Sequence, residues 1–175
     1  MGYVYLFTGD GGGKTTNALG LALRAVAHKR KVFLAQLLKW ENNTGEFIIQ
    51  EMKEFAEYYM VQQYGRYGWH GLDNLTEQDK LNSKQAIVDA WYNIKYGDCK
   101  LIIFDEINLA VYCDLIETDY IKQFIQTVKS LYPNVDIVMT GRNAPQKLMD
   151  LADFVIEIKP LKIPTEQVCT EGVQY

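Results

Sequence analysis

The residues best suited to chemistry form a glycine-rich run that leads into a lysine and two threonines near the N-terminus. Four of the five residues at positions 9–13 are glycine. Glycines let successive backbone N–H groups turn toward one point, and the start of a following helix adds positive potential there. A lysine supplies a full charge, and a threonine hydroxyl can ligate Mg²⁺. The run therefore predicts a phosphate-binding loop made by Gly9, Asp10, Gly11, Gly12, Gly13, Lys14, Thr15 and Thr16.

The spacing within this run departs from the usual P-loop motif, in which a glycine stands five positions before the Gly-Lys pair. Thr8 occupies that position here, and Gly9 leaves only three residues before Gly13. The predicted loop is therefore one residue shorter than the usual one. A glycine-rich turn that merely caps a helix is the alternative. An apolar strand directly before the loop and a helical pattern directly after it favour phosphate binding.

An acidic pair provides a second candidate group. Asp105 and Glu106 follow the apolar residues 101–104, and a carboxylate at the end of a buried strand can hold Mg²⁺ directly or through water. A helix cap at Asp105 is the structural alternative, but the presence of the glycine loop favours the metal role. Arg142 follows a further apolar segment. It could bind phosphate or cap the edge of the sheet, and the sequence favours neither role over the other.

Apolar segments and helical patterns alternate along the chain, and this alternation predicts how the candidate groups are positioned. We expect strands at residues 3–7, 31–38, 58–64, 101–106, 136–140 and 154–158. We expect helices after the glycine loop, at 44–55, from Thr76 to Gly97, at 108–116, at 119–131 and at Pro145, with an irregular tail at 160–175. Such alternation is typical of a parallel sheet covered on both faces, with ligands at the carboxyl ends of its strands. The predicted fold is α/β, a three-layer P-loop NTPase-like fold with a mostly parallel central sheet, in a single domain at residues 1–175.

Composition and charge limit the classes of function. The 175 residues carry a formal net charge of −4, and 48% of them are hydrophobic, which suits one globular domain without a nucleic-acid-binding face. No apolar run reaches the ~18 residues of a membrane span, and the first strand starts too early to leave room for a signal peptide. The three cysteines are widely spaced and odd in number. We therefore expect reduced thiols in a cytoplasmic protein.

Two familiar classes of P-loop protein do not fit. GTPases read guanine through an Asn-Lys-x-Asp segment, which the chain lacks, and Asp-x-x-Gly does not occur outside the glycine loop itself. Nucleoside kinases of the thymidine-kinase type would be expected to have a zinc site made by paired cysteines, and the chain has no such pairs. The sequence therefore favours neither of these two classes.

The chain resembles the ATP:cob(I)alamin (corrinoid) adenosyltransferases of the P-loop type from about Tyr5 to Ile158. The resemblance includes the same shortened glycine loop together with several further segments. These segments are Gly20-Leu21-Ala22-Leu23-Arg24-Ala25, Gln36-Leu37-Leu38-Lys39, Tyr67-x-Trp69, Phe104-Asp105-Glu106 and Thr140-Gly141-Arg142. The shortened loop combined with Thr-Gly-Arg is quite specific, although each piece alone would be weak.

The resemblance implies an unusual use of the glycine loop. In the family, reduced cobalt attacks C5′ of ATP and the whole triphosphate leaves, so that no phosphoryl group is transferred. The loop, Lys14 and Mg²⁺ would then stabilise the charge that grows on the leaving group. Thr15 and Glu106 are the implied ligands of Mg²⁺, with Asp105 just beyond them.

Tyr67 and Trp69 match an aromatic pair in a mobile loop of the family. That pair displaces the lower ligand of the cobalt and so eases its reduction to cobalt(I). An ordinary loop anchor is the alternative role for Trp69. The resemblance further implies ATP and a corrinoid as substrates in adenosylcobalamin synthesis or salvage, with an electron-donor protein as partner. It leaves the oligomeric state open, with a homodimer as one option.

Three features depart from the family pattern. Gly12 stands where the family usually has lysine, so we expect one phosphate contact fewer. Lys162-Ile163 replaces a Lys-His pair. Because Met1 stands two residues before the first strand, we expect this chain to lack the N-terminal extension that covers the active site in the family. A competing hypothesis is a nucleotide-dependent regulator, or a P-loop ATPase or kinase, without corrinoid chemistry. In the regulator, the exposed aromatic residues would form a protein-docking surface.

Overall fold

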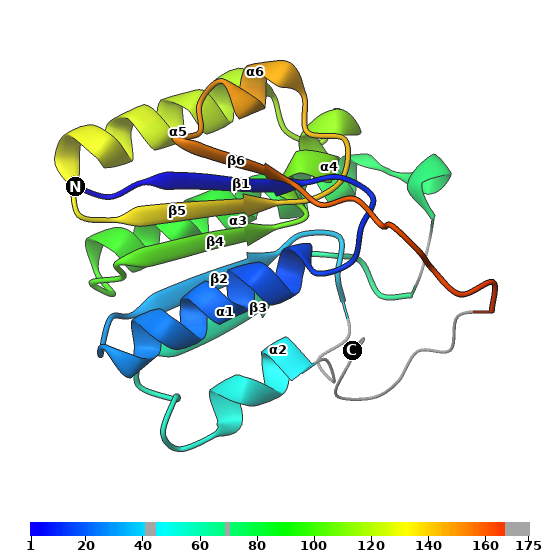
Figure 1. Cartoon of the computed structure of the whole chain (residues 1–175). Helices are drawn as coiled ribbons and strands as arrows, with labels where there is room; N and C mark the ends of the chain where they lie inside the picture. Colours follow the sequence, from blue (N-terminus) through cyan, green and yellow to red (C-terminus); the bar gives the residue numbers. More distant parts are fainter. Residues whose placement is uncertain (41–44, 69–70, 167–175) are drawn as a thin grey trace.

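The computed structural model describes residues 1–40, 45–68 and 71–166, which form a six-stranded sheet with helices on both sides. The strands are β1 (Val4–Thr8), β2 (Val32–Gln36), β3 (Tyr59–Gln63), β4 (Leu101–Asp105), β5 (Asp136–Thr140) and β6 (Phe154–Glu157). Their order is β3-β2-β4-β5-β1-β6, and every pairing is parallel. All the arrows in Figure 1 consequently point the same way. The predicted parallel sheet is confirmed.

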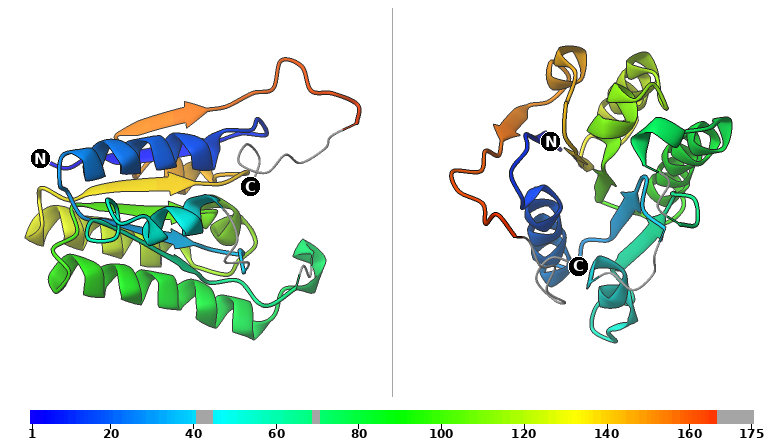
Figure 2. Two further views of the ribbon diagram at one scale, coloured as in Figure 1. Left: turned by 90° about the horizontal axis from the view of Figure 1, so that it is seen from below. Right: turned by 90° about the vertical axis from the view of Figure 1, so that its right-hand side faces the viewer.

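Helices form a layer on each side of this sheet. They are α1 (Lys14–Ala27), α2 (Gly45–Ile48), α3 (Glu77–Lys95), α4 (Ile107–Tyr112), α5 (Thr118–Leu131) and α6 (Gln146–Met149), with short 3-10 helices η1 (Ile49–Glu51) and η2 (Leu72–Asn74). Helix α1 lies on one face of the sheet, and α3 and α5 lie on the other (Figure 2). The predicted α/β class and three layers are therefore confirmed. None of the helices in the described part of the chain is long and apolar enough to cross a membrane.

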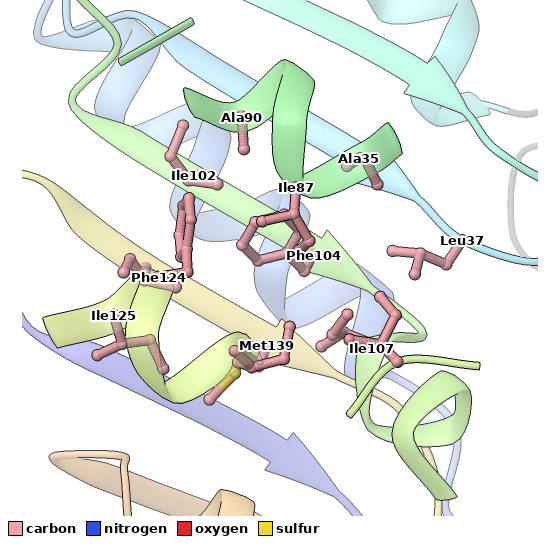
Figure 3. Packing of buried hydrophobic residues seen from close by; sticks show 14 of the residues in the cluster. Ala35, Leu37, Ile87, Ala90, Ile102, Phe104, Ile107, Phe124, Ile125 and Met139 are labelled. Atoms are coloured by element: carbon pink, nitrogen blue, oxygen red, sulfur yellow. The ribbon is translucent and has the colours of Figure 1, made fainter. Parts of the chain in front are cut away.

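The larger part of the core lies between the sheet and helices α3 to α5 (Figure 3). The ring of Phe104 in β4 contacts that of Phe124 in α5, with centroids 5.3 Å apart, and Ile87 and Ala90 of α3 pack beside them. On the other face, small residues such as Ala22 bring α1 close to the sheet. Burial of this apolar surface fixes the strands whose ends carry the candidate site.

The carboxyl ends of four strands bring the candidate groups to one edge of the sheet. The glycine loop follows β1, Lys39 follows β2, Asp105 ends β4 and Thr140 ends β5. Strand β5 pairs with both β1 and β4, so it separates the glycine loop from the acidic pair by one strand. Both groups therefore face the same space, as predicted for ligand sites in parallel sheets.

The predicted covering of the sheet on both faces is wrong for β6. All four of its residues are exposed, including Phe154 at 46% and Ile156 at 37%. Strand β6 is the last in the strand order, and an edge strand can lie beyond the width that the helical layers cover. The ring of Tyr5 in β1 stacks on that of Phe154, with centroids 4.8 Å apart, which gives the strand partial cover from its neighbour.

Two helices also differ from the expected ranges. At 44–55 the structure has only α2 and then η1, followed by turns up to residue 58, and Thr44 itself lies outside the described residues. Apolar residues reach the core from these short turns, so their spacing imitates that of a longer helix. Helix α4 ends before the predicted Ile116, because Asp114 has a positive φ of 56° that turns the chain.

Candidate active site

The glycine loop joins β1 to α1 in a conformation that glycine adopts most easily. Gly9 and Gly13 have φ angles of 95° and 102°, in the left-handed region where a side chain would be strained. The N–H of Gly11 donates to the carbonyl of Ile158 at 2.9 Å, which fixes the loop to the end of β6. Gly13 directly precedes α1, so the positive potential of the helix N-terminus is directed into the loop.

Lys14 lies inside this loop and is shielded from solvent. Its residue is 7% exposed, and its Nζ donates to the carbonyl oxygens of Gly9 at 2.7 Å and of Gly11 at 2.8 Å. Burial lowers the pKa of Lys14 from its ordinary value, although the nearby Glu106 carboxylate acts in the opposite direction. The loop therefore holds a cation whose carbonyl partners could be exchanged for phosphate oxygens, which bind an ammonium group more strongly.

Asp105 is the centre of a hydrogen-bond network that joins four parts of the chain. The residue is fully buried. Its Oδ1 accepts from the hydroxyl of Thr15 at 2.8 Å and from that of Thr140 at 2.6 Å. Its Oδ2 accepts from Nζ of Lys39 at 2.7 Å and from Nε2 of Gln36 at 3.1 Å. This carboxylate is therefore fully used within the protein and orients Thr15 at the start of α1.

The charge of Asp105 is balanced mainly by Lys39. Burial opposes ionisation of Asp105, but Lys39 and the hydroxyl donors hold the pKa of this carboxyl below its ordinary value. Burial also disfavours the charged form of Lys39, yet Asp105 raises its pKa. Lys39, Gln36 and Thr140 are not among the predicted site residues. The signal that could have found them is their position at the ends of strands beside β4, with Gln36 in register with Asp105.

Glu106 differs from Asp105 because one of its oxygens is unpaired. Glu106, with a positive φ of 65°, is the residue that precedes α4, so the alternative of a helix cap at Asp105 is wrong. Within the described structure, its Oε2 atom is buried without a hydrogen-bond partner. Burial and the neighbouring charge of Asp105 raise the pKa of Glu106. A buried carboxylate oxygen without a described partner, on the wall of the cavity that the glycine loop lines, fits a hard cation such as Mg²⁺.

Arg142 reaches the site from the end of β5. The preceding Gly141 has a φ of 133°, and a side chain there would come within 2.9 Å of the backbone nitrogen of Leu109. The Nδ2 atom of Asn108 donates to the carbonyls of Phe7 at 3.0 Å and of Gly141 at 3.1 Å. Asn108, which the sequence did not single out, thus ties the ends of β1 and β5 together and sets where Arg142 emerges.

The predicted aromatic pair lies only partly within the described structure. Tyr67 is 86% exposed, and its ring centroid lies 4.8 Å from that of Trp40. Trp69 lies outside the described residues. The N–H of Gly65 donates to the carbonyl of Lys39 at 2.7 Å. Tyr67 is therefore placed beside the segment that carries Lys39, and its predicted role stays a prediction.

One cavity of about 1010 Å³ brings most of these groups together, at the upper end of the ~300–1,000 Å³ range of ligand sites. The predicted residues on its wall are Asp10, Gly11, Gly12, Gly13, Lys14, Thr15, Thr16, Glu106 and Arg142. Lys39 and several apolar side chains, including Leu38, Ile49 and Leu72, also line it. A cavity with a cationic, backbone-rich end and an apolar wall suits a nucleotide.

Comparison with known proteins points to one family. A family model described as ATP:corrinoid adenosyltransferase BtuR/CobO/CobP matches residues 1–175. The chain is similar to a corrinoid adenosyltransferase of Sinorhizobium sp., with 30% identity over 177 residues that cover 99% of this chain and 80% of that protein. It is also similar to a corrinoid adenosyltransferase of Escherichia coli (strain K12), with 28% identity over 167 residues that cover 92% and 78% of the two chains.

A further relative is longer. An uncharacterized protein of Nostoc sp. (strain PCC 7120) is 30% identical over 173 residues, which are 93% of this chain but only 45% of that protein. The chain therefore spans less than half the length of that relative.

Proposed function

The chain belongs to the ATP:corrinoid adenosyltransferase family, and we propose that it transfers the 5′-deoxyadenosyl group of ATP to the cobalt of a reduced corrinoid, with release of triphosphate. The observation that carries this proposal is a buried cation, Lys14, in a glycine loop that opens onto one large cavity. Such a loop can hold the triphosphate as a unit. The apolar part of the same cavity is suited to the adenosine.

The reaction requires stabilisation of a departing polyanion. An electron pair of cobalt(I) forms the bond to C5′, and the C5′–oxygen bond breaks with its electron pair leaving on the triphosphate. Negative charge grows on the leaving oxygen, so groups that meet this charge lower the barrier. The backbone N–H groups of the loop and Lys14 are proposed for this role. Arg142 would add a second positive charge from the end of β5.

Thr15 and Glu106 are the residues that would hold Mg²⁺. The Thr15 hydroxyl donates its hydrogen bond to Asp105, which leaves the lone pairs of its oxygen available, and Oε2 of Glu106 is buried without a partner among the described residues. In the part of the chain that the structure describes, no three His, Cys, Asp or Glu side chains form a metal cluster. That finding agrees with Mg²⁺, which binds through few carboxylates plus phosphate and water. When bound, it would neutralise charge on the triphosphate.

The corrinoid side of the reaction rests on Tyr67 and Trp69. We assign to them the displacement of the lower cobalt ligand, which eases reduction to cobalt(I), and we propose an electron-donor protein as the source of the electron. A homodimer and a cytoplasmic location stay predictions, which light scattering and cell fractionation would test. The described cysteines, Cys99 and Cys113, are unpaired, in agreement with a reducing compartment.

Product identity tests the proposal. The protein with ATP, Mg²⁺ and cob(I)alamin should form adenosylcobalamin and inorganic triphosphate in equal amounts, because cleavage at C5′ leaves the three phosphates joined. The same mixture without corrinoid is the control and should release neither ADP nor triphosphate at a comparable rate. ADP release as the main, corrinoid-independent reaction would indicate a P-loop hydrolase or kinase. ATP binding without any turnover would favour the regulator.

A further inference from the structure

Arg66 is a charged residue beside the site that the reaction described above does not use. Its Nε donates to Oδ1 of Asp79 at 2.8 Å, and its terminal NH2 group donates to the carbonyl of Asn74 at 2.8 Å. The side chains of Arg66 and Asp79 are 24% and 5% exposed, so water screens this ion pair less than an ordinary surface pair. The Arg66 side chain therefore joins the two ends of the segment 66–79, and this segment, closed by the ion pair, is called the ring below.

The Asp79 carboxylate has a fixed position because Asp79 lies in the first turn of α3. Its Oδ2 accepts from the N–H of Thr76 at 2.7 Å, which is one half of a capping box, and also from the Thr76 hydroxyl at 2.9 Å. Helix α3 has 19 residues and packs on the sheet through Ala86, Ile87 and Ala90. The carboxylate that receives Arg66 is therefore held by the core of the protein.

The other end of the ring is fixed to the chain that follows β2. The N–H of Gly65 donates to the carbonyl of Lys39, and a side chain on Gly65 would come within 2.8 Å of the carbonyl carbon of Leu38. The two backbones are thus in direct contact at the residue before Arg66. Tyr67, the residue after Arg66, has its ring against that of Trp40. Because Tyr67 directly follows Arg66, the hydrogen bonds that orient the Arg66 side chain also affect the position of Tyr67.

The ring also shares a wall with the nucleotide cavity. Arg66 and Asp79 line a small cavity together with Leu38 and Leu72, and the same two leucines line the large cavity that contains the glycine loop. Loss of the guanidinium would leave the Asp79 carboxylate buried without a cation, an arrangement that proteins relieve by moving the surrounding chain. Because α3 is held by the core, such a movement would affect the segment on the Arg66 side of the ion pair.

We propose that Arg66 is a positioning residue for the corrinoid part of the reaction, since it joins Asp79 to the Asn74 carbonyl and thereby keeps Tyr67 beside Trp40 and the cavity wall. The inference rests on the proposed function, which assigns Tyr67 to the corrinoid. Arg66 is not on the wall of the nucleotide cavity. Its loss should therefore affect the corrinoid and leave ATP binding unchanged.

Arg66→Gln tests the inference, because glutamine keeps a polar side chain but has no charge to pair with Asp79. Lys80→Gln is the matched control, since it removes a 2.7 Å ion pair with Glu77 in the same turn of α3 and leaves the Arg66–Asp79 ion pair in place. The measurements are ATP affinity, the KM for corrinoid, and the absorption change of a cobalt(II) corrinoid on mixing with protein and ATP. Arg66→Gln should raise the corrinoid KM by about tenfold or more and reduce the absorption change, with ATP affinity unchanged. Lys80→Gln should match the wild type.

Hydrogen exchange at the backbone amides of residues 65–75 gives a readout that does not depend on turnover. Exchange there should be faster in Arg66→Gln, while the second half of α3 keeps its protection. Equal losses for ATP and corrinoid, or an Arg66→Gln protein that behaves like the Lys80→Gln control, would overturn the inference. A wild-type protein that neither changes the corrinoid spectrum nor forms adenosylcobalamin would end the proposed function instead. Hydrogen exchange would then still decide whether Arg66 positions the segment.

Discussion

The glycine-loop side of the site and the segment that carries Tyr67 are attached to the fold in different ways. Around Asp105, four donors from three separate parts of the chain meet one fully buried carboxylate. The described residues of the segment 66–79 lie outside the sheet, and the Arg66 guanidinium joins the two ends of this segment. The network around Asp105 is therefore part of the core, whereas the segment 66–79 lies outside the core and is joined to it through Asp79.

This difference separates two kinds of effect. On the glycine-loop side, the residues near the nucleotide also satisfy buried charges, so their loss should lower stability as well as affinity. On the aromatic side, losses should change the reaction with the corrinoid while the sheet stays intact. Such a division suits the two substrates, because a triphosphate needs preorganised donors, whereas a bulky ligand needs a segment that can adjust as it enters and leaves.

Lys14→Ala should have the largest effect. A charge-assisted phosphate contact contributes about 1.5–3 kcal/mol, so ATP affinity should fall by roughly one to two decades. The rate of transfer should fall further, because the leaving triphosphate also loses its cation. Calorimetric titration with ATP and an adenosylcobalamin assay measure the two effects. Lys122→Ala, at an exposed position on α5, is the control. Unchanged affinity and rate would remove the loop from phosphate binding.

Lys39→Met tests how far the glycine-loop side depends on the charge balance at Asp105. The buried carboxylate would lose its cation, so the free energy of unfolding should fall by about 2 kcal/mol. The cost stays below that of a wholly buried pair because the Lys39 side chain is 29% exposed. Denaturant titration at neutral pH measures the change. Lys100→Met, which removes a more exposed pair with Asp98, should cost less than about 1 kcal/mol.

The same Lys39→Met protein should unfold in acid at a higher pH than the wild type. The pKa of Asp105 is depressed in the folded protein, so its stabilising contribution is present above pH ~4 and is lost as the pH falls through the folded pKa. Without Lys39 the folded pKa of Asp105 is higher, and the loss begins earlier in an acid titration. Identical acid midpoints in the two proteins would show that Lys39 does not stabilise this carboxylate.

Trp69→Ala tests whether a loss in the segment that carries Tyr67 affects only the reaction with the corrinoid. ATP affinity and unfolding free energy should stay at wild-type values, and transfer to a corrinoid already reduced to cobalt(I) by a strong chemical reductant should be retained. With a weak biological reductant, the rate should fall by about tenfold or more, since the lower ligand stays on the cobalt. Tyr96→Ala, which removes a 65% exposed ring at the end of α3, is the control. Equal losses in both assays would assign Trp69 to general corrinoid binding or to folding.

Gly12→Lys should have the smallest effect of these variants, a slight increase in ATP affinity. A side chain on Gly12 would meet nothing within 4 Å, so lysine fits there and can restore a phosphate contact. An exposed charge of this kind contributes about 0.5–1 kcal/mol, or roughly two- to fivefold in ATP affinity. Gly13→Ala is the contrasting variant, because its φ of 102° strains any side chain and should weaken binding. A weaker affinity in Gly12→Lys would place Gly12 away from the phosphates.

The glycine loop could be predicted from the sequence because its interactions are mostly local. A strand, a turn and a helix follow one another within residues 4–27, and the carbonyls that Lys14 contacts belong to Gly9 and Gly11, only a few positions away. The α/β class was equally predictable, since alternating apolar and helical periods depend on neighbouring residues. The helix expected at 44–55 failed for the same reason, because short turns can present apolar residues at helical spacing.

Long-range placement decided the rest, and it follows from the strand order that burial imposes. Gln36, Lys39 and Thr140 become partners of Asp105 only because β2 and β5 flank β4. That Oε2 of Glu106 is buried without a hydrogen-bond partner, among the residues that the structure describes, is likewise visible only in the folded chain. The sequence alone determined which residues could bind phosphate and in which fold class. Only the tertiary structure decided which charges are buried together, because the electrostatic cost of each group depends on neighbours that lie far away along the chain.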